Sequence, residues 1–180
     1  QIGYNFCVKL FPIVTISNNS QNVFYQKFLK KIVDRIIKMC YSIVRKGKEV
    51  KKMRICFDMD GTIANLYKVN GWLENLIAED VRPYREAETM VNMNSLARVL
   101  NRLQKQGHEI VIISWLSKCG SDSYNEAVTE TKKAWLRKHL ASVKFDEMNI
   151  VKYGVNKNQC CKSSDDILFD DEEQNRNGWT

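Results

Sequence analysis

The pattern of apolar and polar positions along the chain changes near residue 53. From Asn22 to Val44 the apolar residues recur every three or four positions, with five Lys or Arg residues between them. This spacing predicts a basic amphipathic helix. Such a helix can pack on the main domain, lie on an anionic membrane or fit a partner's groove. We favour packing on the main domain, or an upstream extension, over a membrane contact. The charged run 45–52 is expected to be an exposed linker.

Beyond residue 52, short apolar runs alternate with amphipathic segments. Strands are predicted at 54–59, 109–114, 149–153 and 167–169, and helices at 94–106 and from Ser121 or Asp122 to Leu140. The run 109–114 is nearly all β-branched, which predicts a strand buried on both faces. Strands that alternate with helices predict an α/β domain with a parallel sheet.

Charge divides the chain at the same place. The net charge is +7, but residues 1–52 hold 11 Lys or Arg against 2 Asp or Glu, whereas residues 53–180 hold 17 against 19. We therefore expect a basic N-terminal extension, 1–52, followed by one domain, 53–180. The domain is not basic enough for a stable nucleic-acid partner to be expected. No apolar run approaches the roughly 20 residues that span a bilayer.

The cysteines favour a reduced, cytoplasmic setting. Among the six there is no CxxC pair, and neither of the two histidines lies near a cysteine in the sequence. The spacing of zinc ligands is therefore missing, and adjacent Cys160 and Cys161 rarely bridge each other.

The strongest chemical signal is the string Phe57-Asp58-Met59-Asp60-Gly61-Thr62-Ile63 at the end of the first predicted strand. Residues two apart on a strand point the same way, so Asp58 and Asp60 can face one site. Gly61 allows a sharp turn that brings backbone N–H groups near an anion. Two carboxylates in one cleft favour a hard cation such as magnesium. The plainer interpretation is an Asp-Gly turn after a buried strand.

This string resembles the first motif of the haloacid dehalogenase-like phosphatase superfamily, and three further motifs follow in order. Ser114, after the apolar run 110–113, resembles the second-motif hydroxyl, and Lys157 resembles the third-motif lysine. Asp170 and Asp171 resemble the acidic pair of the fourth motif. Each alone has a plainer interpretation, as a turn serine, a surface lysine or an exposed acidic loop. Together, in this order, the four are far more specific.

The segments 135–140 and 169–176 resemble the 5'(3')-deoxyribonucleotidase-like branch of that superfamily. The resemblance covers about residues 53–179, and residues 1–52 have no counterpart in it. It implies a Rossmann-like three-layer sandwich with a parallel sheet, and a small, largely helical cap over about 67–91. In the family the chain continues past the position of Thr180, so we expect this chain to be a piece of a longer protein.

The resemblance also implies a mechanism. Asp58 would attack a phosphate monoester and form an aspartyl-phosphate, while Asp60 would protonate the leaving alcohol and then activate water. Magnesium would be bound by Asp58, the backbone carbonyl of Asp60 and Asp170, with Asp171 as a ligand through water or as a support.

The same resemblance assigns the residues that would bind the substrate. The catalytic Ser114 and Lys157 would offset the phosphoryl charge, together with backbone N–H groups of the loop. Gly61, Thr62 and Trp115 would line the same site.

Three functions stay open on the sequence. The first is a 5'-nucleotidase acting on nucleoside monophosphates, and the second is a phosphatase of another small phosphate ester or a nucleic-acid end. The third is a non-enzymatic interaction protein that acts through its basic helix. In the first case the cap would choose the substrate, with Tyr67, Trp72, Arg82 and Arg85 as candidates, although the two aromatic residues fit a packing role equally well.

Overall fold

Strands and helices alternate through residues 52–179, the part of the chain that the computed structural model describes. The strands are β1 (Arg54–Phe57), β2 (Ala64–Asn65), β3 (Glu88–Thr89), β4 (Glu109–Trp115), β5 (Glu147–Val151) and β6 (Ile167–Phe169). The α-helices are α2 (Trp72–Ile77), α3 (Arg82–Glu86), α4 (Met93–Lys105), α5 (Asp122–His139) and α6 (Glu173–Asn177), and two 3-10 helices are η1 (Leu66–Lys68) and η2 (Lys157–Cys160). The basic helix predicted at 22–44 lies outside the described residues.

Four of the strands form one sheet in the order β5-β4-β1-β6, and every neighbouring pair is parallel. Parallel neighbours need long connections, and α4, α5 and η2 lie in the connections between successive sheet strands. The predicted α/β class with a parallel sheet is confirmed. Since all four strands run the same way, their carboxyl ends meet at one edge, where α/β folds bind ligands.

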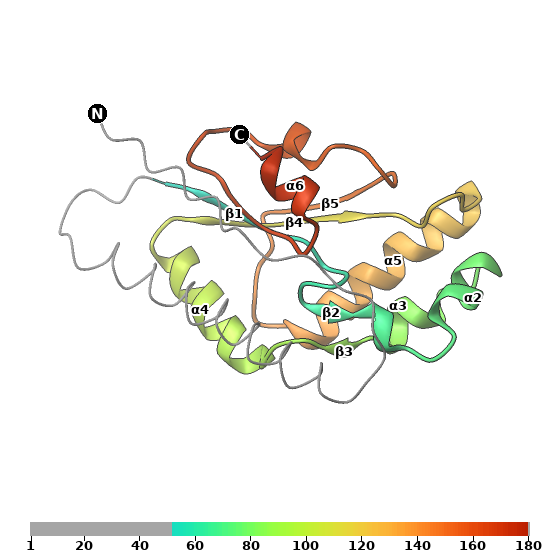
Figure 1. Ribbon diagram of the computed structural model, residues 1–180. Coiled ribbons are helices and arrows are strands. Elements are labelled where there is room, and N and C mark those ends of the chain that lie inside the picture. Colours follow the sequence, from blue (N-terminus) through green and yellow to red (C-terminus); the bar gives the residue numbers. More distant parts are fainter. Residues whose placement is uncertain (1–51, 180) are drawn as a thin grey trace.

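One face of the sheet packs against the two long helices. Ile55, Ile110 and Ile112 lie in a single apolar cluster with residues of α4 and α5, among them Leu100 and Trp135. Figure 1 shows both helices on the same side of the strands. A side-chain cap starts each helix: Asn92 accepts from the Ser95 N–H and Ser121 from the Tyr124 N–H. The sequence predicts the cap at Ser121, whereas the cap at Asn92 was not predicted.

The other face holds a smaller apolar cluster of Cys56, Val111, Ile113 and Leu168, covered in part by Cys160 of η2 and by Trp179. Figure 1 places α6 and the C-terminal segment on this side. Residues 110–113 are all buried, so the prediction of a strand buried on both faces is confirmed.

Two predicted strands differ by two residues from the observed ones at their ends, and a third, β4, runs one residue further, to Trp115. β1 stops at Phe57 rather than Met59, because the Met59 carbonyl accepts N–H groups from Thr62, Ile63 and Ala64 and turns the chain. β5 covers 147–151 rather than 149–153, because its pairing with β4 begins at Glu147 and the chain turns at Gly154, whose φ is +79°. Apolar content alone places such ends poorly.

The segment 67–91 contains α2, α3 and β3, and β3 pairs with β2 in a small antiparallel sheet. Tyr84 of α3 lies in a buried cluster with Leu66, Tyr124 and Val128, which joins this segment to α5. The indole N–H of Trp135 also donates to the Ala87 carbonyl at 2.8 Å. None of the helices within residues 52–179 is both long and apolar enough to cross a membrane.

Candidate active site

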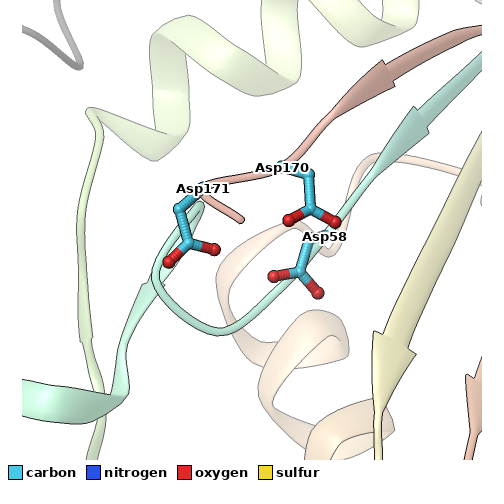
Figure 2. Close-up of side chains that lie close together, drawn as sticks. All are labelled: Asp58, Asp170 and Asp171. Carbon is cyan, nitrogen blue, oxygen red and sulfur yellow. The ribbon is translucent and has the colours of Figure 1, made fainter. Parts of the chain in front are cut away.

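Three acidic side chains meet where the two strands β1 and β6 end. Asp58 follows β1, while Asp170 and Asp171 follow β6, the parallel neighbour of β1. The Asp58 N–H donates to the Phe169 carbonyl at 2.8 Å, which extends the pairing by one residue and brings the loops together. Figure 2 shows the three carboxylates gathered beside these strand ends. One ligand atom from each lies within 4.8 Å of the other two.

Asp58 and Asp170 are buried and Asp171 is partly exposed, and the negative charges of the three repel one another. Burial, followed by the charge of Asp58, raises the pKa of Asp170 and raises that of Asp171 well above its ordinary value. The Oδ2 atom of Asp171 is buried without a hydrogen-bond partner. Gathered carboxylate oxygens with an unused acceptor fit a hard divalent cation, because only a positive ion offsets their mutual repulsion. The residues expected to bind magnesium therefore fit such an ion.

Lys157 joins the nucleophile candidate to the acidic pair. Its Nζ lies 2.8 Å from Asp58 Oδ1 and 2.7 Å from Asp170 Oδ2, and the side chain is only 1% exposed. Burial would lower the pKa of Lys157, but the carboxylates of Asp58 and Asp170 raise it above its ordinary value. Lys157 is therefore a positive charge held beside Asp58, while its role toward a phosphate stays a prediction.

A second buried lysine, Lys132 of α5, was not identified from the sequence. Its Nζ donates to Asp60 Oδ2 at 2.5 Å, to Ser114 Oγ at 2.9 Å and to the Trp115 carbonyl at 2.5 Å. The side chain is fully buried. Burial and the charge of Asp58 raise the pKa of Asp60, although Lys132 opposes the shift. Asp60 and Ser114 thus share one cation instead of standing alone.

The sequence did carry a signal for Lys132. It lies four residues after Val128 and three before Trp135, on the stripe of α5 that faces the core. A lysine on a buried stripe needs a partner, since an unpaired ammonium there is strongly disfavoured. The sequence does not determine which carboxylate is that partner, because the choice depends on how α5 crosses the sheet.

The loop after β1 packs tightly on the acidic pair. Gly61 has φ +77°, and a Cβ there would lie 2.3 Å from Asp171 Oδ2. The N–H groups of Gly61 and Thr62 donate inside the turn, to the carbonyls of Ala64 and Met59. Thr62 Oγ1 lies 3.4 Å from Asp171 Oδ1. These two residues therefore shape the site, while their role in substrate binding stays a prediction.

Of the four candidates in segment 67–91, Tyr67 is the one whose hydroxyl is influenced by the charges of the site carboxylates. Burial of its hydroxyl, followed by the charges of Asp171 and Asp60, raises the pKa of Tyr67, although the residue as a whole is half-exposed. Its ring meets Trp72 edge to face, with centroids 5.1 Å apart. Arg82 donates to Asn75 within the segment, and the exposed Arg85 lies near Glu86. Within residues 52–179, neither arginine makes a hydrogen bond or an ion pair with the acidic trio.

No family model, curated protein or solved structure matches this chain. A function is therefore inferred from the side chains and their positions alone. The similarity to haloacid dehalogenase-like phosphatases stays a prediction that rests on the four ordered motifs.

Proposed function

We propose that this chain carries a magnesium-dependent phosphatase of the haloacid dehalogenase-like kind, with a Rossmann-like sandwich and a cap over residues 67–91. The observation that carries the proposal is the position of Lys157, within 2.8 Å of Asp58 and 2.7 Å of Asp170. Lys157 thus bridges the carboxylate that follows β1 and the acidic pair that follows the neighbouring strand β6. An anion that enters here meets a nucleophile and a fixed cation together.

Asp58 is the proposed nucleophile. One of its oxygens attacks the phosphorus of a phosphate monoester, the bond from phosphorus to the ester oxygen breaks, and an aspartyl-phosphate forms. Asp60 gives a proton to the departing alkoxide and later takes one from the water that hydrolyses the intermediate. The raised pKa of Asp60 favours the protonated form that the first step needs.

Three side chains would offset the charge of the transferred group. Lys157 lies beside Asp58, while Lys132 and Ser114 are hydrogen-bonded to each other on the β4 side. Magnesium, held by Asp58, Asp170 and the Asp60 carbonyl with Asp171 in support, would supply further positive charge at the phosphoryl oxygens.

The proposed substrate is a nucleoside monophosphate, which makes the activity that of a 5'-nucleotidase. Tyr67 supports this, because its half-exposed ring, packed edge to face on Trp72, leaves an aromatic surface on which a base could stack. A reduced, cytoplasmic setting is proposed with it, and the four cysteines in the described part of the chain are free thiols.

The test is phosphate release with and without magnesium from the full chain and two variants. Asp58→Asn is expected to abolish turnover and any phosphoenzyme trapped by rapid quench with labelled substrate. Asp60→Asn is expected to lose about 100- to 10,000-fold, and less on an aryl phosphate, whose good leaving group needs little protonation. Asp122→Asn, at the exposed start of α5, is the matched control. Wild-type turnover by Asp58→Asn would refute the covalent mechanism.

A further inference from the structure

A series of ring contacts leads from Lys157 to the molecular surface. The Lys157 Nζ lies 4.9 Å from the centre of the Trp115 ring. That ring in turn lies 5.2 Å from the ring of Tyr153, tilted by 51°. Tyr153 follows β5, the strand at one edge of the sheet, and is 52% exposed. The proposed phosphate site and this surface aromatic residue are therefore two contacts apart.

Trp115 is held firmly between them. Its indole N–H donates to the Val155 carbonyl at 2.8 Å, and its own carbonyl accepts from Lys132. The first bond ties the end of β4 to the loop after β5, and the second ties it to α5. The Trp115 ring, fixed in this way, contacts the Tyr153 ring, while about half of Tyr153 stays exposed to solvent. A fixed aromatic ring of this kind suits stacking, because little side-chain freedom is lost on binding.

Lys118 lies next to this surface. Its Nζ is 5.6 Å from the centre of the Tyr153 ring, and no carboxylate of the described residues pairs with it. A cation–π contact at an exposed site is weak, so a flat ligand displaces the ammonium at little cost. The displaced ammonium then has three donors for oxygens of the ligand. An exposed ring beside an unpaired cation is the combination that binds a nucleotide by stacking and charge.

We propose that Tyr153, supported by Trp115, stacks on the base of a nucleotide substrate, with Lys118 donating to its polar atoms. The proposal rests on the phosphatase function above and assigns the place where the aromatic base of the substrate binds, at the β5 edge of the site. The sugar between phosphate and base would span the face of Trp115. The surface beyond the catalytic residues thus becomes a specificity site that is separate from the cap.

The experiment compares adenosine 5'-monophosphate with ribose 5-phosphate, which carries an anomeric hydroxyl in place of the base. For Tyr153→Leu, the ratio of kcat/KM for the nucleotide to kcat/KM for the sugar phosphate is expected to fall about 10-fold. Tyr153→Phe keeps the ring and is expected to keep the ratio. Lys118→Met is expected to lower it less than Tyr153→Leu does. Lys105→Met, an exposed lysine of α4 before the opposite ends of the strands, is the matched control.

Two failures are distinguishable. An active wild type whose ratio is unchanged in Tyr153→Leu overturns the stacking site and leaves the phosphatase standing. A wild type that releases no phosphate from either compound overturns the phosphatase. In that case, equilibrium dialysis of the Asp58→Asn chain, with and without Tyr153→Leu, still measures whether the ring favours the nucleotide over the sugar phosphate. Equal binding of the two compounds overturns the stacking site as well.

Discussion

At the scale of single residues, two buried lysines neutralise much of the acidic site. Lys157 pairs with Asp58 and Asp170, and Lys132 pairs with Asp60. Each ammonium is nearly or fully buried, so it stays charged only because carboxylates surround it. Removing a lysine therefore affects two properties at once: the folded state is left with an uncompensated buried charge, and the site loses positive potential for an anion.

Lys132→Met is expected to lower the free energy of unfolding by about 3 kcal/mol, because Asp60 then lacks its partner. Activity is expected to fall about 100-fold or more, as for the loss of one donor to a developing charge. Adding Asp60→Asn to it should restore part of the stability and none of the activity. Lys133→Met is the control and should change little, because Lys133, next in α5, is partly exposed and pairs with the exposed Glu130. Urea denaturation and phosphate release measure both effects.

Gly61→Ala tests the close packing of the loop on the acidic pair. The new Cβ would lie 2.3 Å from Asp171 Oδ2 in a backbone with φ +77°, so both strain and collision are expected. Gly107→Ala provides the comparison, because φ is +89° there but nothing lies within 4 Å. Gly107→Ala should cost about 1 kcal/mol with activity retained. Gly61→Ala should cost about 1–3 kcal/mol more and lower activity. Equal costs would show that Asp171 moves aside freely.

At the scale of elements, Arg54 ties the first residue of β1 to the strands on either side. Its guanidinium lies within 3.3 Å of Glu109 at the start of β4, Glu147 at the start of β5 and Asp166 just before β6. The side chain is 7% exposed and that of Asp166 is 2% exposed. One cation therefore joins the amino ends of all four sheet strands, at the edge opposite the acidic site.

Arg54→Met is expected to lower the free energy of unfolding by about 2–3 kcal/mol. This is the low end for breaking a buried ion pair, because Glu109 and Glu147 are partly exposed. Lys68→Met removes the exposed pair with Glu88 and should cost less than about 1 kcal/mol. Chemical denaturation of the two variants gives the comparison. Equal losses would mean that the arginine does not hold the strand ends together.

At the scale of the whole molecule, the stability of the fold depends on pH through a buried histidine at the amino end of the sheet strands. His108, which precedes β4, is 3% exposed, and its Nδ1 accepts the Met53 N–H at 3.3 Å. Burial lowers the pKa of His108 below its ordinary 6.5. As the pH falls through that value, the unfolded chain takes up a proton that the folded chain resists. The contribution of His108 to the stability of the folded state is therefore complete above about pH 6.5 and is lost as the pH falls below it.

His108→Asn removes the imidazole that takes up the proton, and the side-chain oxygen of the asparagine can still accept the Met53 N–H. The free energy of unfolding, measured by urea denaturation from pH 7.5 to 5, is expected to fall less steeply in the variant. His139 is less buried, and its pKa is also lowered, so His139→Asn is the control and should change the slope less. An unchanged slope in His108→Asn would contradict the assignment.

The sequence determined the elements and the order of the motifs by itself. Four sheet strands and two long helices follow from apolar spacing, because a buried face must recur with the period of the element that carries it. Asp58, Ser114 and Asp170 could be placed at strand ends for the same reason. Lys157 was found through its order among the motifs, and the structure brings its Nζ to within 3 Å of both carboxylates.

Tertiary structure alone decided which of these groups pair. Strand order places β6 beside β1, so Asp170 meets Asp58 at one end of these two strands. At their other end Arg54 meets Asp166, which lies 112 positions away along the chain. The crossing of α5 brings Lys132 to Asp60 and Ser114, and the β5 edge brings Tyr153 to Trp115. Local propensity contains no information on such contacts, because burial and charge pairing depend on distance in space and not along the chain.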